Sequence, residues 1–189
     1  AIIDWMMTLE PEWYSTMIGV YFFAGAVVAI LSFTILLVQF AYAQGALRGV
    51  VTTEHLHDVA KLLFGFTIFW TYLMWAQFLV IWYGNMPEET GFVFSRLWGS
   101  WLPVGTAVGI GMFIVPFFGL LGVAPKKVRA TMGFFALVSL VALWLERYLL
   151  VLPSVSALPG PVFERPELGP TLLFLGLYLV AYALFGRTF

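Results

Sequence analysis

Five long runs without a charged residue constrain the fold of this chain more than any other feature of its sequence. They span residues 13–47, 62–87, 97–125, 130–145 and 168–186. A helix needs about 20 consecutive apolar residues to cross a bilayer core, and continuous rather than alternating runs disfavour a barrel. The sequence therefore predicts an all-α polytopic transmembrane helix bundle of about five spans. The helices are expected near 14–43, 55–83, 98–122, 127–151 and 169–187, with turn-forming residues between them and a loop at 84–97.

The composition agrees with a membrane protein. The chain is 62% hydrophobic and only 10% charged, whereas a soluble domain carries about a quarter charged residues. The formal net charge of -1 argues against a nucleic-acid partner, which needs a basic stripe. The absence of cysteine excludes zinc and iron–sulfur clusters bound through thiolates of this chain. We therefore treat residues 1–189 as a single membrane domain.

The charged residues between the runs predict an orientation. One side, formed by the N-terminus and the 84–97 and 152–168 loops, is mainly acidic: its basic residues are Arg96 and Arg165, and its acidic residues are Asp4, Glu10, Glu12, Glu88, Glu89, Glu164 and Glu167. The other side is mainly basic: it holds Arg48, Lys61, Lys126, Lys127, Arg129 and Arg187 against Glu54 and Asp58. Because basic residues concentrate in cytoplasmic loops, we expect the N-terminus outside and the C-terminus in the cytoplasm.

Glu146 and Arg147 stand inside the fourth predicted helix, after a run without charge. A charge near the middle of a membrane helix costs roughly 2.5–3.5 kcal/mol, so it normally faces the bundle interior or a water path. Adjacent residues point about 100° apart on a helix, and we therefore do not expect a simple ion pair between the two. A structural polar clamp between helices and a proton or substrate pathway are both compatible with this pattern.

The second predicted helix carries further polar groups. His57 and Asp58 lie in its first turns, within one sector with Lys61. They are compatible with a solvated helix start or with the cytoplasmic mouth of a proton route. Further along, the helix offers Thr67, Thr71 and Gln77 within the hydrocarbon. Beyond its outer end stand Glu88 and Glu89, which fit either proton release or a soluble loop.

Several sites are excluded or expected from the spacing of residues. A membrane b-type haem needs axial histidines within the bundle, and His55 and His57 share one turn near the cytoplasm. Neither a haem nor a metal site is expected in this chain, and no phosphate loop or nucleophile triad indicates a self-contained enzyme. In the third helix, Gly105 and Gly109 form a G-x-x-x-G close-packing motif. Pro116 is expected to kink that helix.

Three blocks of this sequence resemble a known family. They are "DWMMTLEPEWYSTMIGVYFFAGAVVA" (4–29), "HLHDVAKLLFGFTIFWTYLMWAQFLVIWYGNMPEET" (55–90) and "LERYLLVLPS" (145–154). Together they resemble the ActF subunits of bacterial alternative complex III, which are NrfD/PsrC-like membrane proteins. Members of this family are longer and contain two helix bundles, so the chain is expected to be the C-terminal half of such a protein.

The resemblance implies a role in a quinol:cytochrome c (or other periplasmic acceptor) oxidoreductase of the bacterial inner membrane, with quinol or menaquinol as the substrate of the complex. The implied partners are a homologous quinol-binding membrane subunit, a multihaem cytochrome c subunit, an iron–sulfur subunit and small membrane subunits. Haem c and the iron–sulfur clusters belong to those partners, and this chain is expected to bind no cofactor itself.

Proton half-channels are proposed in this family, and the resemblance gives them candidate residues here. The matching positions are His57 and Asp58 at the inner mouth, Glu146 and Arg147 in the outer half, and Glu88 and Glu89 in the outer loop. One departure is Ala76-Gln77, where the family has Ser-Gln, so a hydroxyl step is missing unless water or Gln77 replaces it.

The expected function is that of a non-haem subunit with a structural and proton-translocating role coupled to quinol oxidation nearby. Two other classes share the same features. A secondary transporter or channel fragment would transport its substrate without redox partners. A pure assembly anchor would use Glu146 for stability alone.

Overall fold

The computed structural model describes residues 2–45, 47, 49–155, 160–161 and 165–188, apart from the side chains of 165–168 and 186–188. Among the charged residues counted above, Arg48 and Glu164 lie outside this description, as do the side chains of Arg165, Glu167 and Arg187. The chain divides into two units, residues 1–157 and 158–189. Each unit is described by itself.

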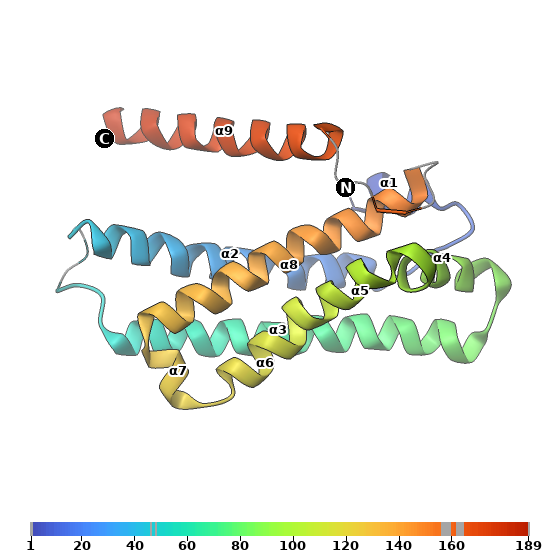
Figure 1. The fold of residues 1–189 in the computed structure, drawn as a ribbon, viewed down its shortest axis with the longest axis horizontal. Helices are drawn as coiled ribbons and strands as arrows, with labels where there is room; N and C mark the ends of the chain where they lie inside the picture. The colour runs from blue at the N-terminus through green and yellow to red at the C-terminus, as the bar shows by residue number, and fades with distance from the viewer. Residues whose placement is uncertain (1, 46, 48, 156–159, 162–164, 189) are drawn as a thin grey trace. The chain divides into compact units, whose positions relative to one another are not determined.

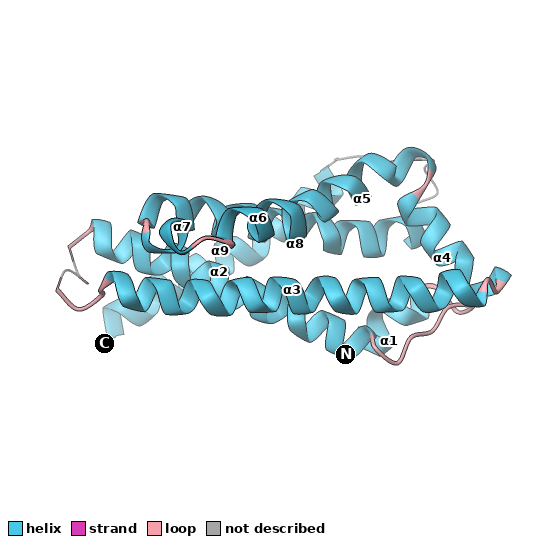
Figure 2. Cartoon of the chain, turned by 90° about the horizontal axis from the view of Figure 1, so that it is seen from below, coloured by secondary structure: helices cyan, strands magenta, loops and turns pink. Residues whose placement is uncertain are grey.

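Four helical segments of the first unit are long and apolar enough to cross a membrane. They are α2 (Ile18–Ala43), α3 (Thr53–Gly84), the segment Gly99–Leu120 and α8 (Arg129–Val155). Figure 1 shows α2 and α3 running along one another and α8 crossing α2 obliquely. The described residues form helices and loops without strands (Figure 2). The expectation of an all-α bundle is confirmed for these four segments. The second unit holds α9 (Arg165–Thr188), whose described apolar part is Gly169–Phe185, and the fifth span stays a prediction.

The predicted loop at 84–97 is wrong, because most of it forms the helix α4 (Pro87–Leu97). Asn85 ends α3 in the left-handed conformation with φ 46°. Pro87 then occupies the first turn of α4, where its missing N–H has no helical partner to lose. Glu88 and Glu89 suit that first turn because the N-terminal end of a helix dipole favours negative charge.

The third predicted helix, 98–122, is a composite. It consists of a 3-10 turn (Gly99–Trp101), α5 (Leu102–Gly109), a π turn (Ile110–Ile114) and α6 (Val115–Leu120). The π turn ends two residues before Pro116, whose ring and missing N–H disturb the hydrogen bonds of the preceding turn. A short helix, α7 (Val123–Lys127), then leads to α8.

The remaining helix boundaries differ from expectation at their ends. The first long helix starts at Ile18 rather than 14, after the short N-terminal elements α1 (Ile2–Met6) and a 3-10 turn (Met7–Leu9). Helix α8 continues through Pro153 to Val155 instead of ending near 151. This last turn is supported from outside, because Arg96 Nη2 donates to the Leu150 carbonyl at 2.8 Å and also to Ser154 Oγ.

Polar contacts between different elements mark the two ends of the first unit. At one end, called the Arg96 end below, Ser154 Oγ donates to Glu10 Oε1 at 2.8 Å. At the opposite end, called the Lys127 end, Lys127 Nζ donates to Glu54 Oε1 at 3.0 Å. The N-terminal segment, α4 and the C-terminus of α8 thus meet at one end, as the charge pattern predicts. The direction in which these ends cross a membrane stays a prediction.

Small residues let the helices approach closely, although not at the predicted pair. Gly105 has Leu97 Cδ2 only 3.0 Å from the position of an added Cβ, but Gly109 has no atom within 4 Å. Two further close approaches in this segment are at Gly111, where an added Cβ would lie 2.6 Å from Ala142 Cβ, and at Gly119, where it would meet the Phe135 ring. The G-x-x-x-G motif therefore contributes one packing glycine, and the π turn and α6 supply one each.

Candidate functional site

Glu146 is buried in the bundle, on the face of α8 that contacts the other helices, with 2% of its surface exposed. Arg147 Nη1 lies 3.1 Å from Glu146 Oε2 and 3.2 Å from Oε1. The expectation that the two residues do not pair is therefore wrong. The two Cα–Cβ bonds diverge, but the Arg147 side chain is long enough to fold back onto its neighbour.

Two features of α2 hold Arg147 in this folded-back position. Its guanidinium carbon lies 3.3 Å from the centre of the Phe22 ring, a cation–π arrangement. A Cβ on Gly25 would lie 2.7 Å from Arg147 Nη2, so only glycine leaves room for the guanidinium there. The ion pair thus depends on two residues of another helix.

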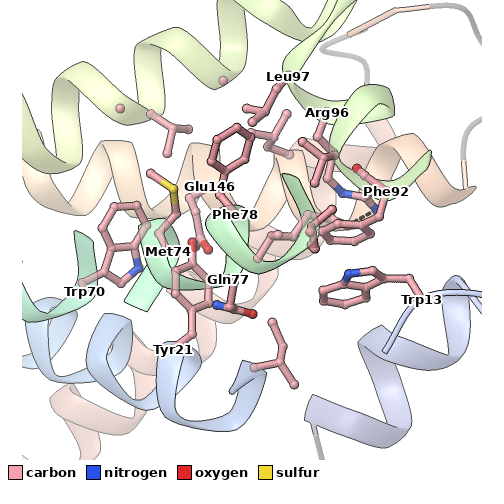
Figure 3. A pocket seen from close by; sticks show the side chains of 18 residues that line it. Trp13, Tyr21, Trp70, Met74, Gln77, Phe78, Phe92, Arg96, Leu97 and Glu146 are labelled. Atoms are coloured by element: carbon pink, nitrogen blue, oxygen red, sulfur yellow. Dashed lines mark hydrogen bonds between the residues drawn. The ribbon is translucent and has the colours of Figure 1, made fainter. Parts of the chain in front are cut away.

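Tyr21 brings a hydroxyl from α2 to the same carboxyl. This hydroxyl lies within hydrogen-bonding reach of Glu146, and Figure 3 shows the two side chains facing each other. The Tyr21 ring packs against Trp70 of α3, with ring centres 5.3 Å apart. Glu146 is therefore contacted by charged, polar and aromatic groups from its own helix and α2.

A cavity of about 140 Å³ opens beside Glu146. Its walls come from the segment before α2 and from α2, α3, α4, α5 and α8, and they are mainly apolar and aromatic (Figure 3). Four polar side chains interrupt this lining: Tyr21, Gln77, Arg96 and Glu146. The cavity therefore joins the buried carboxyl to the residues of the Arg96 end.

Three N–H donors in the walls of this cavity are buried and have no hydrogen-bond partner within the described part of the chain. They are Trp13 Nε1, Trp70 Nε1 and Arg96 Nε. Buried polar groups are normally satisfied, and an exception calls for a bound molecule or a functional reason. The donors are suited to acceptor oxygens, such as those of water or of a carbonyl-bearing ligand.

Arg96 lines the cavity at the Arg96 end and is 3% exposed. Its guanidinium donates to the Phe92 carbonyl at 3.0 Å, lies 3.7 Å from the Phe92 ring centre and is 3.6 Å from Glu10 Oε1. Burial lowers the pKa of Arg96 to about 10, with Glu10 acting in the opposite direction, so the side chain remains charged at neutral pH. Sequence reasoning counted Arg96 only as an outer basic residue. The available signal was its position as the single basic residue of an acidic segment.

The structure separates the predicted polar residues of α3. Gln77 reaches the cavity, and its Oε1 accepts from Ser15 Oγ at 2.9 Å. Thr67 and Thr71 instead donate to carbonyl oxygens of their own helix, Leu63 and Thr67 respectively, both at 2.9 Å. Their hydroxyl protons are therefore already engaged, and neither threonine lines the cavity.

The predicted mouth residues lie apart from this site. Asp58 is exposed and pairs with Lys61 at 2.7 Å, and His57 lies beside it near the start of α3. Twenty residues of helix separate His57 from Gln77, which is about 30 Å of rise. Glu88 and Glu89 begin α4 and do not line the cavity. Glu146, Arg147 and Gln77 are thus brought together, whereas His57, Asp58, Glu88 and Glu89 are not.

Within the described residues, no group of three or more histidine, aspartate or glutamate side chains is arranged to hold a metal ion. A scan against family models and a search of curated proteins find no match for this chain.

Proposed function

We propose that this chain is a membrane subunit of a bacterial quinol-oxidising complex of the alternative complex III type, in which Glu146 binds and releases protons. The observation that carries the proposal is the position of Glu146, a buried carboxyl beside an arginine and at the wall of a cavity. Ionisable groups inside a membrane bundle are costly and mark proton or substrate pathways by default. The sequence resemblance supports the choice of complex.

The arrangement can move a proton without moving a helix. As a carboxylate, Glu146 is stabilised by Arg147 and by the Tyr21 hydroxyl. When Glu146 takes up a proton, it becomes neutral, while Arg147 retains the Phe22 ring as a favourable neighbour. Arg147 therefore has a favourable neighbour in both protonation states of Glu146, which is required if Glu146 is to bind and release a proton.

The cavity provides the exit for this proton. Its buried donors are suited to hold water, and Gln77 with Ser15 continues the polar contacts from the cavity to the N-terminal segment. Arg96 and Glu10 form a second polar contact at the same end. In the proposed orientation, with the N-terminus outside, the proton is released at the outer surface of the inner membrane.

In this proposal, electrons pass through haem c and iron–sulfur clusters of partner subunits, and quinol is oxidised in a homologous membrane subunit. This chain then contributes proton movement and structural support. We assign no redox centre to it.

The test is Glu146→Gln in the intact complex, purified and reconstituted in vesicles. We expect normal assembly, with fewer protons released per electron transferred or a lower turnover. Glu12→Gln, which removes an exposed carboxyl near the same end, is the matched control and should behave like the parent. An assembled Glu146→Gln complex with unchanged proton release and unchanged turnover would refute the relay.

Mass spectrometry of the proteins that co-purify with the tagged chain tests the setting of this function. Multihaem cytochrome c and iron–sulfur partners are expected, together with a c-haem band in the reduced-minus-oxidised spectrum. A colourless, partner-free chain would instead favour a transporter.

A further inference from the structure

The cavity reaches from Glu146 to the Arg96 end only, which leaves open how a proton reaches Glu146 from the opposite end. Two serines in the bundle interior bear on this question. Ser32 on α2 is 0% exposed and Ser139 on α8 is 1% exposed. Neither hydroxyl oxygen has a hydrogen-bond partner in the described part of the chain. Two unpartnered hydroxyls in such a position are unusual.

The packing of α2 against α8 places these serines at the same level. Gly25 of α2 faces Arg147 of α8, and Gln39 of α2 faces Gly133 of α8, since an added Cβ on Gly133 would lie 2.5 Å from Gln39 Oε1. The two helices are therefore antiparallel. Ser32 is midway between Gly25 and Gln39, and Ser139 lies between Gly133 and Arg147.

The heptad spacing also puts both hydroxyls on the interior face. Residues seven apart return to nearly the same side of a helix. Ser32 is seven residues from Gly25 and seven from Gln39, both of which contact α8. Ser139 is seven residues from Glu146, which lines the cavity. The serines thus stand in the same row as the ion pair and Gln39.

The neighbouring threonines show that this lack of partners is specific. In membrane helices, serine and threonine commonly donate to a carbonyl of the preceding turn. Thr34, next but one to Ser32, does so to the Ile30 carbonyl at 2.8 Å, and Thr67 does so to Leu63. Ser32 and Ser139 do not, so their hydroxyls are available to another molecule.

The Lys127 end of this row is polar. Gln39 Nε2 donates to the Arg129 carbonyl at 2.7 Å, and Arg129 lies over the Tyr42 ring at 3.3 Å. A buried hydroxyl without a partner costs about 1–3 kcal/mol, which a bound water would offset.

We propose that Ser32 and Ser139 bind water that enters the α2–α8 interface from the Lys127 end, forming a second polar compartment on the opposite side of the ion pair from the cavity. The role of this water as a proton inlet rests on the proposed function, but the binding of water by the two serines does not. This route replaces the predicted one through Thr67 and Thr71 of α3.

The absence of cysteine from this chain allows a direct test. Ser32→Cys and Ser139→Cys are introduced singly into the tagged chain, and membrane vesicles of both orientations are treated with Ag⁺, an ion small enough to follow water. The chain is then denatured, and cysteines that did not react are modified with a polyethylene-glycol maleimide and counted by gel shift.

Leu63→Cys and Leu120→Cys are the matched controls, because both residues are buried and apolar and lie on α3 and α6, outside the α2–α8 interface. Thr53→Cys, at the exposed start of α3, is the positive control at the Lys127 end. We expect Ser32→Cys and Ser139→Cys to react at least about tenfold faster than the buried controls, because only a hydrated thiol ionises readily. The reaction should proceed from the Lys127 side.

Two results would overturn the proposal. Serine-site cysteines as slow as the Leu63 and Leu120 controls would show a dry interface, in which the two hydroxyls serve only close packing. Reaction from the Arg96 side alone would show that water arrives through the cavity. Proton release by the Ser32→Ala/Ser139→Ala complex separates this inference from the proposed function. If the cysteines react as expected but the double alanine variant releases protons normally, the water is present and is not the proton inlet. Failure of the proposed relay is instead detected by Glu146→Gln.

Discussion

Gly25→Ala is the substitution that most directly tests how the Glu146–Arg147 pair is built. The new Cβ would lie 2.7 Å from Arg147 Nη2 and 3.2 Å from Leu143 Cδ1. Both distances are shorter than ordinary contact, so the guanidinium must move away from the Phe22 ring or from Glu146. The variant removes no polar group, so its clash acts through displacement of Arg147 and Leu143.

The expected magnitude follows from two opposing contributions. Overpacking a well-filled interior costs about 1–3 kcal/mol, while alanine is favoured over glycine in a helix by about 0.8–1.0 kcal/mol. Gly65→Ala on α3 is the matched control, since Gly65 is exposed and has no atom within 4 Å of an added Cβ. The difference between the two variants cancels the helix preference and leaves a cost of about 1–3 kcal/mol for the clash.

Thermal unfolding of the purified chain in mild detergent measures this difference. At about 2–4 °C per kcal/mol for a chain of this size, Gly25→Ala should unfold roughly 2–12 °C below Gly65→Ala. Repeating Gly25→Ala in an Arg147→Ala background should make it much less costly, because residues in contact are not additive. Equal stability of the two glycine variants, or the same cost in both backgrounds, would refute this account of the ion pair.

Three further outcomes follow from the site. Tyr21→Phe removes the hydroxyl that lies beside Glu146 and should reduce proton release by the complex, while the unfolding temperature of the chain stays within a few degrees of the parent. Proton release equal to that of the parent would exclude Tyr21 from the relay. Arg96→Lys cannot reproduce the contacts with Phe92, Leu150 and Ser154, so it should destabilise the chain by about 1–3 kcal/mol in thermal unfolding. Unchanged stability would show that these contacts do not hold α4 against the end of α8. Thr71→Val should leave proton release unchanged, because the hydroxyl serves its own helix, and a clear decrease would restore the α3 route.

The long apolar runs were sufficient to predict the four long helical segments, because a charge-free stretch of that length has few stable alternatives. They were insufficient at 84–97, where local chemistry decides the structure. Pro87, the two glutamates and Arg96 together favour a short helix, but each residue by itself is equally common in loops.

The candidate site was predictable in its centre and not in its surroundings. Glu146 is conspicuous because it interrupts an apolar run, and it is buried as expected. Its pairing with Arg147 depends on Gly25 and Phe22, more than 100 residues earlier in the chain, and no local rule contains that information. The threonines of α3 misled for a related reason, since sequence does not reveal whether a hydroxyl donates to its own helix or across an interface.

The π turn at Ile110–Ile114 has a consequence for how this segment tolerates changes in length. Buried residues of the segment recur every fourth position, at Val104, Val108, Met112, Pro116 and Leu120. In an ideal α-helix, each step of four residues overshoots a full turn by about 40°, so such a row would wind around the helix. The wider π turn absorbs part of this rotation and keeps both halves phased toward the bundle. Deleting one residue there would leave seven steps of about 100° between Val108 and Pro116, close to two full turns, so a regular helix would still direct Gly105 and Val108 toward the cavity. A single-residue deletion would therefore be tolerated better at the π turn than in α5 or α6, where it would rotate the flanking residues by about 100°.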